Sequence, residues 1–206
     1  MDATRIILVR HGETDWNAAG RIQGHSDTPL NAMGREQAQR VAARLAGEPL
    51  RAIYASDLAR AHQTATIIGQ PLQLGVVTSP GLRERRYGVW EGLTWAEIQA
   101  RYPEQILERR ARPMDFAPPG GESLRDVSDR VAAFCDEHLT EGLVVAVSHV
   151  SPIKAAVAWA LHADETASWR MHLDLASITR IGGRAHTAAL VTFNETAHLD
   201  DLSDPA

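Results

Sequence analysis

The chain has 206 residues, of which 44% are hydrophobic, and its formal net charge is −5 at pH 7. This length suits one well-buried core, and the lack of a basic excess excludes nucleic acid or an anionic membrane as a partner recruited by overall charge. The single cysteine, Cys135, excludes an intramolecular disulfide framework and fits a reducing compartment. With no leader-like pattern and no run of membrane-spanning length, the sequence predicts a cytoplasmic protein.

Short apolar runs predict three strands that are buried on both faces, at residues 6–9, 52–55 and 143–147. Helical patterns alternate with these runs, at residues 31–47, 58–68, 123–139 and 152–160, and a capping pattern at 94–97 opens a shorter helix. Alternating strands and helices predict an α/β fold, a three-layer α/β/α sandwich with a mostly parallel central sheet. Binding groups are then expected at the carboxyl ends of the strands.

The C-terminal region predicts a further pair of strands. Residues 177–181 and 189–193 flank a glycine pair and are typical of a late hairpin or edge pair, which would allow a homodimer. The acidic residues 199–206 are expected to form a frayed tail. The predicted organisation is therefore a single domain over residues 1–198 followed by this tail.

One internal segment breaks the helical periodicity. Residues 109–121 combine an arginine-rich run with two prolines and two glycines at the end of the segment. Such composition is typical of an irregular loop. We therefore expect a lid-like excursion over about residues 101–121.

Arg10 and His11 follow the first predicted strand directly, in the motif Arg10-His11-Gly12-Glu13-Thr14. An arginine fork matches phosphate oxygens, and a neutral imidazole nitrogen can accept a phosphoryl group and later release it to water. Gly12 is expected to let the backbone turn sharply, so that the ring is exposed above the sheet. A histidine at a strand end can also simply cap or pack, and other segments must decide between these interpretations.

Further segments follow in order along the chain. They are Trp16-Asn17, Gly20-Arg21-Ile22-Gln23-Gly24, Asp27-Thr28-Pro29-Leu30, Ser56-Asp57-Leu58-Ala59-Arg60-Ala61, Gln63-Thr64-Ala65, Leu82-Arg83-Glu84, Gly88 with Trp90-Glu91-Gly92, Gly121-Glu122-Ser123, and Ser148-His149. With these segments in this order, the chain resembles the histidine phosphatase superfamily, which includes cofactor-dependent phosphoglycerate mutases and many acid phosphatases. It is most similar to bacterial acid phosphatases of the α-ribazole phosphatase type, and the resemblance implies a phosphoglycerate mutase-like fold.

The resemblance implies a role for each residue of the phosphate chemistry. His11 would accept the phosphoryl group as a phosphohistidine, which water then hydrolyses. Arg10, Arg60 and His149 match the family's phosphate pocket, whose donors stabilise the transferred group. Glu84 matches the proton donor, which the chemistry needs because an alkoxide leaves badly unless it is protonated.

Two other interpretations of the acid stay open. Glu84 could simply pair on the surface with Arg83, Arg85 or Arg86, its arginine neighbours in the sequence. Glu91 is a rival acid, although the glycines around it suggest a structural turn. We rank Glu84 first.

The remaining matches concern substrate binding. Thr14, Asn17, Gln23 and Gly24 match positions that line the family's phosphate or substrate pocket, with loop capping as the other interpretation. Val150 stands where the family often has glycine, and its side chain narrows the space beside the phosphate. The predicted binding set is thus Arg10, Thr14, Asn17, Gln23, Gly24, Arg60, His149 and Val150.

Neither a metal nor another cofactor is expected. The nine histidines include no His-x-x-x-His or His-Glu-x-x-His spacing, and the glycines form no Walker loop or dinucleotide fingerprint. The leading hypothesis is a metal-independent phosphatase of a small phosphate ester that works through a phosphohistidine. The alternatives are a phosphoglycerate mutase, which protects the same intermediate from water, and a non-catalytic phosphate-binding protein on the same scaffold.

Overall fold

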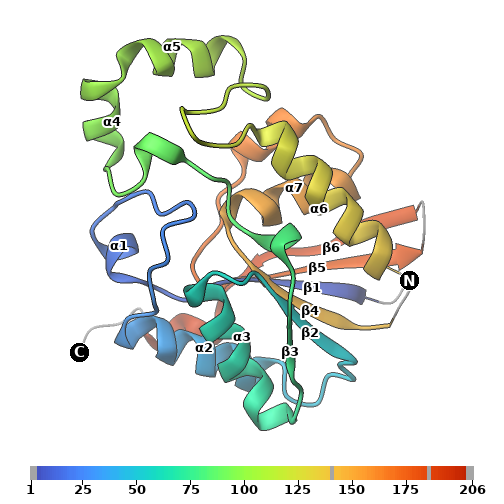
Figure 1. The fold of residues 1–206 in the computed structure, drawn as a ribbon. Coiled ribbons are helices and arrows are strands. Elements are labelled where there is room, and N and C mark those ends of the chain that lie inside the picture. Colours follow the sequence, from blue (N-terminus) through green and yellow to red (C-terminus); the bar gives the residue numbers. More distant parts are fainter. Residues whose placement is uncertain (1–3, 140–141, 185–186, 203–206) are drawn as a thin grey trace.

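Six strands form one sheet in the order β3-β2-β4-β1-β5-β6 in the computed structural model, which describes residues 4–139, 142–184 and 187–202 (Figure 1). The strands are β1 (Thr4–Arg10), β2 (Ala52–Ala55), β3 (Val76–Thr78), β4 (Val144–Ser148), β5 (Ile178–Arg184) and β6 (Thr187–Glu195). The first four positions in this order are parallel, and β5 and β6 are antiparallel to their neighbours. The predicted mostly parallel sheet and the late hairpin are both confirmed.

Helices cover both faces of this sheet. They are α1 (Asp15–Ala18), α2 (Ala32–Arg44), α3 (Ala59–Leu72), α4 (Trp95–Arg101), α5 (Pro103–Ala111), α6 (Leu124–His138) and α7 (Val150–Ala160). Short 3-10 turns are η1 (Pro80–Leu82), η2 (Gly88–Trp90), η3 (Glu165–Arg170) and η4 (Ala197–Leu202). The predicted caps are present, because Asn31, Thr94 and Ser123 each accept a hydrogen bond from the first turn of α2, α4 and α6.

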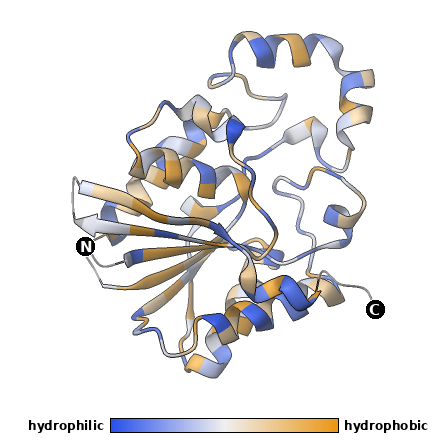
Figure 2. Ribbon diagram, turned by 180° about the vertical axis from the view of Figure 1, so that it is seen from behind, coloured by the Kyte–Doolittle hydropathy of each residue, from blue (hydrophilic) through white to orange (hydrophobic). Residues whose placement is uncertain are grey.

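The alternation of side chains along β1 divides the core into two layers. Ile6 and Leu8 pack with α6 and α7 on one face, whereas Ile7 and Val9 pack with α2 and α3 on the other. The interior strands are accordingly hydrophobic along their length (Figure 2). The three-layer sandwich is therefore confirmed, and the central strands β1 and β4 are covered on both faces.

Two helices and one strand were not predicted. The expected irregular excursion contains helix α5, which begins at Pro103 in the first turn, a position where proline is tolerated. Together with α4 and the loop that follows α5, it encloses a small core of its own around Trp90 and Phe116. Strand β3 and the single-turn α1 were also missed, since both are too short for a periodic signal.

The expected frayed tail is partly wrong. Residues 197–202 form η4, and Leu199 packs on the α2 side of the core, while residues 203–206 lie outside the described residues. Besides Leu199, a hydrogen bond of 3.0 Å between His198 and the Ala176 carbonyl and the ion pair of Asp201 with Arg40 hold this turn against the body of the protein. No helix in the described ranges is long and apolar enough to cross a membrane.

Gly12 is required for close packing rather than for a sharp turn. Its φ is not in the left-handed region, but a Cβ added there would lie 2.3 Å from the carbonyl oxygen of Gly34 on α2. A Cβ on Gly34 would in turn lie 2.1 Å from the carbonyl oxygen of Glu13. The loop after β1 and the start of α2 therefore touch backbone to backbone.

We expect Gly34→Ala to lower the free energy of unfolding by about 3 kcal/mol, because the new methyl group would overpack against main chain that cannot rotate away. Urea unfolding at neutral pH measures this loss. Gly75→Ala is the matched control, since no atom lies within 4 Å of a Cβ at that position. Equal stability of the two variants would contradict the close contact.

Candidate active site

The parallel register of β1 and β4 brings two histidines together. Arg10 pairs with Ser148 in the ladder, and the His11 amide donates to the Ser148 carbonyl at 3.0 Å. His11 and His149 therefore follow adjacent strand ends, and their ring centroids are 5.0 Å apart. Neighbouring parallel strands thus place both rings at the carboxyl edge of the sheet.

The ring of His11 is held with one nitrogen facing the backbone. Its Nδ1 lies 2.7 Å from the Gly12 carbonyl oxygen, which can only accept, so Nδ1 carries the proton and Nε2 keeps its lone pair. Burial lowers the pKa of His11 well below 6.5, and the positive charges of Arg60 and Arg10 lower it further. The imidazole is therefore neutral and oriented, the form that a nucleophile needs.

Two buried guanidinium groups flank this ring. Arg10 donates to the Leu173 carbonyl at 2.6 Å, and Arg60, at the start of α3, donates to the carbonyls of Gly24 and Ser26. Neither forms an ion pair among the described residues, and the Nε of each lacks a hydrogen-bond partner. Burial lowers the pKa of each arginine to about 10, which leaves both charged at neutral pH.

His149 is fully buried at the start of α7, and neither of its ring nitrogens has a hydrogen-bond partner. Burial lowers its pKa well below 6.5, with a further contribution from Arg60. Unpaired polar atoms inside a protein are costly, unless a ligand supplies their partner. Arg10, Arg60 and His149 thus surround His11 with nitrogen atoms that lack hydrogen-bond partners. This arrangement indicates a binding site for an anion.

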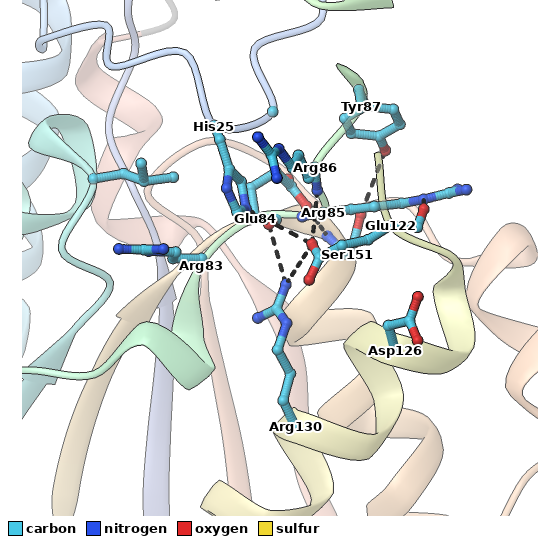
Figure 3. Close-up of polar contacts among 12 residues, drawn as sticks. His25, Arg83, Glu84, Arg85, Arg86, Tyr87, Glu122, Asp126, Arg130 and Ser151 are labelled. Atoms are coloured by element: carbon cyan, nitrogen blue, oxygen red, sulfur yellow. Dashed lines mark hydrogen bonds and ion pairs between the residues drawn. The ribbon is translucent and has the colours of Figure 1, made fainter. Parts of the chain in front are cut away.

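Glu84 follows η1 and turns its carboxylate to the N-terminus of α7. Its oxygens accept from the backbone amides of Arg85 at 2.7 Å, Val150 at 3.1 Å and Ser151 at 3.2 Å. Its own carbonyl accepts from Arg130 on α6 at 3.1 Å, which fixes the loop from below (Figure 3). A negative charge is favoured at this helix end.

The arginines near Glu84 in the sequence point elsewhere. Arg83 pairs with Asp57 at 2.7 Å, and Arg85 donates to the carbonyls of Phe116 and Glu122. Among the described side chains no ion pair joins Glu84 to these arginines or to Arg86. The carboxylate therefore stays available to the cavity rather than to the surface.

Glu91 has a different environment. It accepts from the backbone amides of His25, Ser26 and Tyr87 and from the Ser26 hydroxyl. These bonds tie the loop before Asp27 to the loop after Glu84. Glu91 thus has a structural role, as the glycines near it in the sequence suggest.

A cavity of about 230 Å³ opens between these groups. Its walls include eight of the residues named from the sequence, namely Arg10, His11, Asn17, Gln23, Gly24, Arg60, Glu84 and Val150. Thr14 does not line it but caps α1, where it and Asn17 bond reciprocally as a capping box. His149 is not among the lining residues, but its ring lies beside that of His11, with the two centroids 5.0 Å apart.

Three further residues, Arg21, Ile22 and Tyr87, line the cavity and were not predicted as site residues. Arg21 and Ile22 belong to the segment Gly20-Arg21-Ile22-Gln23-Gly24, which matches the family, and Tyr87 lies three residues after Glu84. Nearness to matched positions is the signal that could have found them.

The part of the chain that the structure describes contains no group of three or more His, Cys, Asp or Glu side chains able to hold a metal ion.

The depressed histidine pKa values predict how stability depends on pH. The unfolded chain takes up protons on His11 and His149 below about pH 6.5, whereas the folded chain does not, so the free energy of unfolding should fall as the pH decreases. Each group contributes up to about 1.4 kcal/mol per pH unit in this range. Urea titrations between pH 7 and pH 5 should show a shallower fall in the double variant His11→Asn/His149→Asn, and equal slopes would contradict the buried neutral histidines.

The fold and the cavity define an α/β protein that offers buried cations and a neutral histidine to an anion at the carboxyl edge of its sheet. Comparison with known proteins agrees: residues 6–196 match the model of the histidine phosphatase superfamily (branch 1). The chain is 34% identical over 202 residues to phosphoserine phosphatase 1 of Hydrogenobacter thermophilus, covering 96% of this chain and 95% of that one. The chain therefore belongs to the histidine phosphatase superfamily.

Two other relatives differ in length and name. A Mycobacterium tuberculosis protein named as bifunctional is 40% identical over 201 residues, which cover 95% of this chain but 55% of that protein. The solved structure of a putative α-ribazole-5′-phosphate phosphatase from Escherichia coli has a TM-score of 0.86 and 29% identity, covering 94% of this chain and 97% of that one. The chain thus corresponds to a whole phosphatase in some relatives and to about half of a longer protein in others.

Proposed function

We propose that this protein is a metal-independent phosphomonoester hydrolase that acts on a small phosphorylated metabolite through a phosphohistidine at His11. The observation that carries the proposal is the neutral His11 ring, with its Nδ1 proton fixed on the Gly12 carbonyl, beside two buried arginines without ion-pair partners among the described residues. A non-catalytic phosphate-binding protein would need the cations but not the nucleophile beside an acid.

In the first half-reaction the Nε2 lone pair of His11 attacks phosphorus, and the bond to the ester oxygen breaks. Arg10, Arg60 and His149 hold the three equatorial oxygens of the transferred group. Glu84, when protonated, gives its proton to the leaving oxygen, so that an alcohol departs rather than an alkoxide.

In the second half-reaction water attacks the phosphohistidine. Glu84, now ionised, takes a proton from this water, the bond from phosphorus to Nε2 breaks, and His11 returns to its neutral form. Inorganic phosphate is released, and Glu84 is again protonated. The bond-making and proton-transfer steps of this cycle therefore use one histidine, one carboxyl group and one water molecule.

Relatives support a small metabolite as the substrate. They include a phosphatase named for phosphoserine and one named for α-ribazole 5′-phosphate, both phosphomonoesters of small alcohols. The cavity beside His11 has a volume of about 230 Å³, below the roughly 300–1,000 Å³ of pockets for larger ligands. The proposal treats residues 1–198 as the phosphatase domain and residues 101–121 as its lid.

The proposal is tested by phosphate release from p-nitrophenyl phosphate with a chelator present, at mildly acidic to neutral pH. Release that survives the chelator, with 80 Da added to the His11 peptide after rapid quenching, is the expected result. Release that stops with the chelator would refute the metal-independent route. Faster formation of 2-phosphoglycerate than of phosphate from 3-phosphoglycerate would identify a mutase instead.

The proposal also includes a cytoplasmic location and a homodimer. Cys135 is a free thiol buried in the core, which fits a reducing compartment. Strand β6 is an edge of the sheet, with Val191 48% exposed, and an unpaired edge can join a second copy. Sedimentation of the purified protein tests the dimer, and a monomer at all concentrations would contradict it.

A further inference from the structure

The loop of residues 171–177 lies directly against the turn that carries His11. It connects η3 to β5, and its Ala176 amide donates to the His11 carbonyl at 3.2 Å, while its Ser177 carbonyl accepts from the Arg10 amide at 3.2 Å. A third bond reaches the side chain, because the Arg10 guanidinium donates to the Leu173 carbonyl at 2.6 Å. The loop therefore holds both the main chain and the side chain of Arg10.

The protein anchors Arg10 at one point and Arg60 at two. Within the described ranges the Leu173 carbonyl is the single hydrogen-bond acceptor of the Arg10 guanidinium, and the Nε of Arg10 has no partner. The guanidinium of Arg60 donates to two carbonyls, those of Gly24 at 2.7 Å and Ser26 at 3.0 Å. One bond orients a planar group less firmly than two. The direction of the Arg10 side chain therefore depends on the direction of the Leu173 carbonyl.

The peptide group between Leu173 and Asp174 is held from its other end by Asn194. The Leu173 C=O and the Asp174 N–H belong to one planar unit, so they turn together. The Asp174 amide donates to Oδ1 of Asn194 at 2.8 Å, and Nδ2 of Asn194 donates to Oδ2 of Asp174 at 2.7 Å. Asn194 thus fixes the rotation of the plane whose carbonyl accepts from Arg10.

Asn194 lies at an irregularity in β6. Ile178 pairs with Glu195 but Arg180 pairs with Thr192, so β6 has one more residue than β5 between these two pairs. Within this bulge Asn194 has a φ of 55°, a left-handed conformation that asparagine adopts more readily than most residues do. Bulges redirect side chains, and here the Asn194 amide group meets the loop rather than continuing the ladder.

The carboxylate of Asp174 supports the charge of the same arginine. The hydrogen bond from Asn194 lowers the pKa of Asp174, and contacts with His172 and the charge of Arg10 lower it further. Burial lowers the pKa of Arg10 to about 10, and the negative charges of Glu84 and Asp174 act against this change. Asn194 therefore orients the Asp174 peptide and also keeps the Asp174 carboxylate ionised near Arg10.

We propose that Asn194 is a positioning residue for phosphate transfer, which sets the direction of the Arg10 guanidinium through the peptide group between Leu173 and Asp174. This rests on the proposed function, in which Arg10 holds one equatorial oxygen of the transferred group. Asn194 is not among the residues that line the phosphate cavity. It acts on the reaction through Arg10 alone.

The first test is Asn194→Gly, which removes the side chain and keeps the backbone, because glycine adopts a positive φ without strain. We expect kcat/KM for p-nitrophenyl phosphate to fall on the order of tenfold, the scale for weakening one hydrogen bond to a charged group. Gln73→Gly is the matched control. Gln73 has a φ of 56° at the end of α3, its side chain is exposed, and its replacement should leave kcat/KM unchanged.

A double-mutant cycle separates positioning from a general effect on stability. Arg10→Ala protein has no guanidinium to orient, so the addition of Asn194→Gly should change its remaining kcat/KM, measured at high enzyme concentration, by less than about twofold. A residue that only stabilised the fold would cost the same factor in both backgrounds. All rates are measured well below the melting temperature of the least stable variant. An equal loss in both backgrounds, or no loss in Asn194→Gly, would overturn the positioning role.

Asp174→Asn separates direction from charge. The new side chain keeps an oxygen that can accept from Nδ2 of Asn194, and the backbone amide at this position is unchanged, so both hydrogen bonds persist without the negative charge. This variant should lose less than about threefold in kcat/KM. A loss as large as that of Asn194→Gly would assign the effect to the charge of Asp174 and overturn the role of the peptide group.

The wild-type protein tests the proposed function before these variants are compared. If it releases phosphate in a His11-dependent manner and Asn194→Gly is equally active, the positioning role alone fails. If the wild type shows no His11-dependent release from p-nitrophenyl phosphate, the proposed function fails, and the role of Asn194 fails with it.

Discussion

Replacing His11 with alanine should reduce phosphate release by about 10⁴-fold or more, because the variant has no atom that can take the phosphoryl group. The folded structure should persist, since the ring makes a single hydrogen bond, to its neighbour Gly12. The measurement is steady-state phosphate release together with a thermal unfolding curve. His62→Ala, on the exposed side of α3, is the matched control and should keep full activity.

The same variant discriminates between mechanisms. If His11 only bound phosphate, its removal would raise KM and leave kcat within about tenfold of the wild-type value. A phosphoryl group found on another residue of the variant, with turnover retained, would disprove the assignment of the nucleophile. Loss of both the intermediate and the turnover, with an unchanged melting temperature, is the result we expect.

Replacing Glu84 with glutamine should have an effect that depends on the leaving group. Glutamine keeps one oxygen, which can still accept the amides of Arg85 and Ser151 that share Oε1 in the wild type, although its NH2 group would then face the Val150 amide. It has no acidic proton to give to a departing alkoxide. Alkyl phosphates, whose alcohols leave badly, should lose about 10²- to 10⁴-fold in kcat. With p-nitrophenyl phosphate, whose leaving group is stable as an anion, the loss in the phosphorylation step should be several times smaller.

Glu91→Gln is the control for this experiment. The Glu91 carboxylate accepts three backbone amides and one hydroxyl, so the substitution should lower the melting temperature. It should not change how the rate depends on the leaving group. If instead Glu91→Gln selectively slowed alkyl phosphates and Glu84→Gln did not, the two carboxylates would exchange roles.

The sheet and the edge at which the site lies were predictable from local patterns. Continuous apolar runs predicted β1 and β4, and the rule that groups gather at strand ends placed His11 near His149, as their 5.0 Å separation shows. Arg60 was placed by the start of a helix that the pattern also predicted. In each of these cases the residue lies at the end of a strand or helix that the sequence pattern predicts.

The rest depended on contacts between distant segments. The carboxylate of Glu84 reaches the amides of Val150 and Ser151, 66 and 67 residues away, and no local pattern encodes that approach. Helix α5 was missed because its polar, arginine-rich sequence buries little more than Ile106. The contribution of Tyr87 to the cavity arises in the same way, from a turn held by Glu91.

The attachment of residues 101–121, the proposed lid, also decides how this enzyme can be re-engineered. Arg85 is 2% exposed, and it hydrogen-bonds carbonyls at both ends of the segment from Phe116 to Glu122, while its own chain neighbour is Glu84. A lid transplanted from a relative must therefore present two carbonyls at the same places, or a buried guanidinium loses its partners at a cost of several kcal/mol. The proposed lid and the loop that contains Glu84 would therefore have to be exchanged together, because grafting either alone would displace the other.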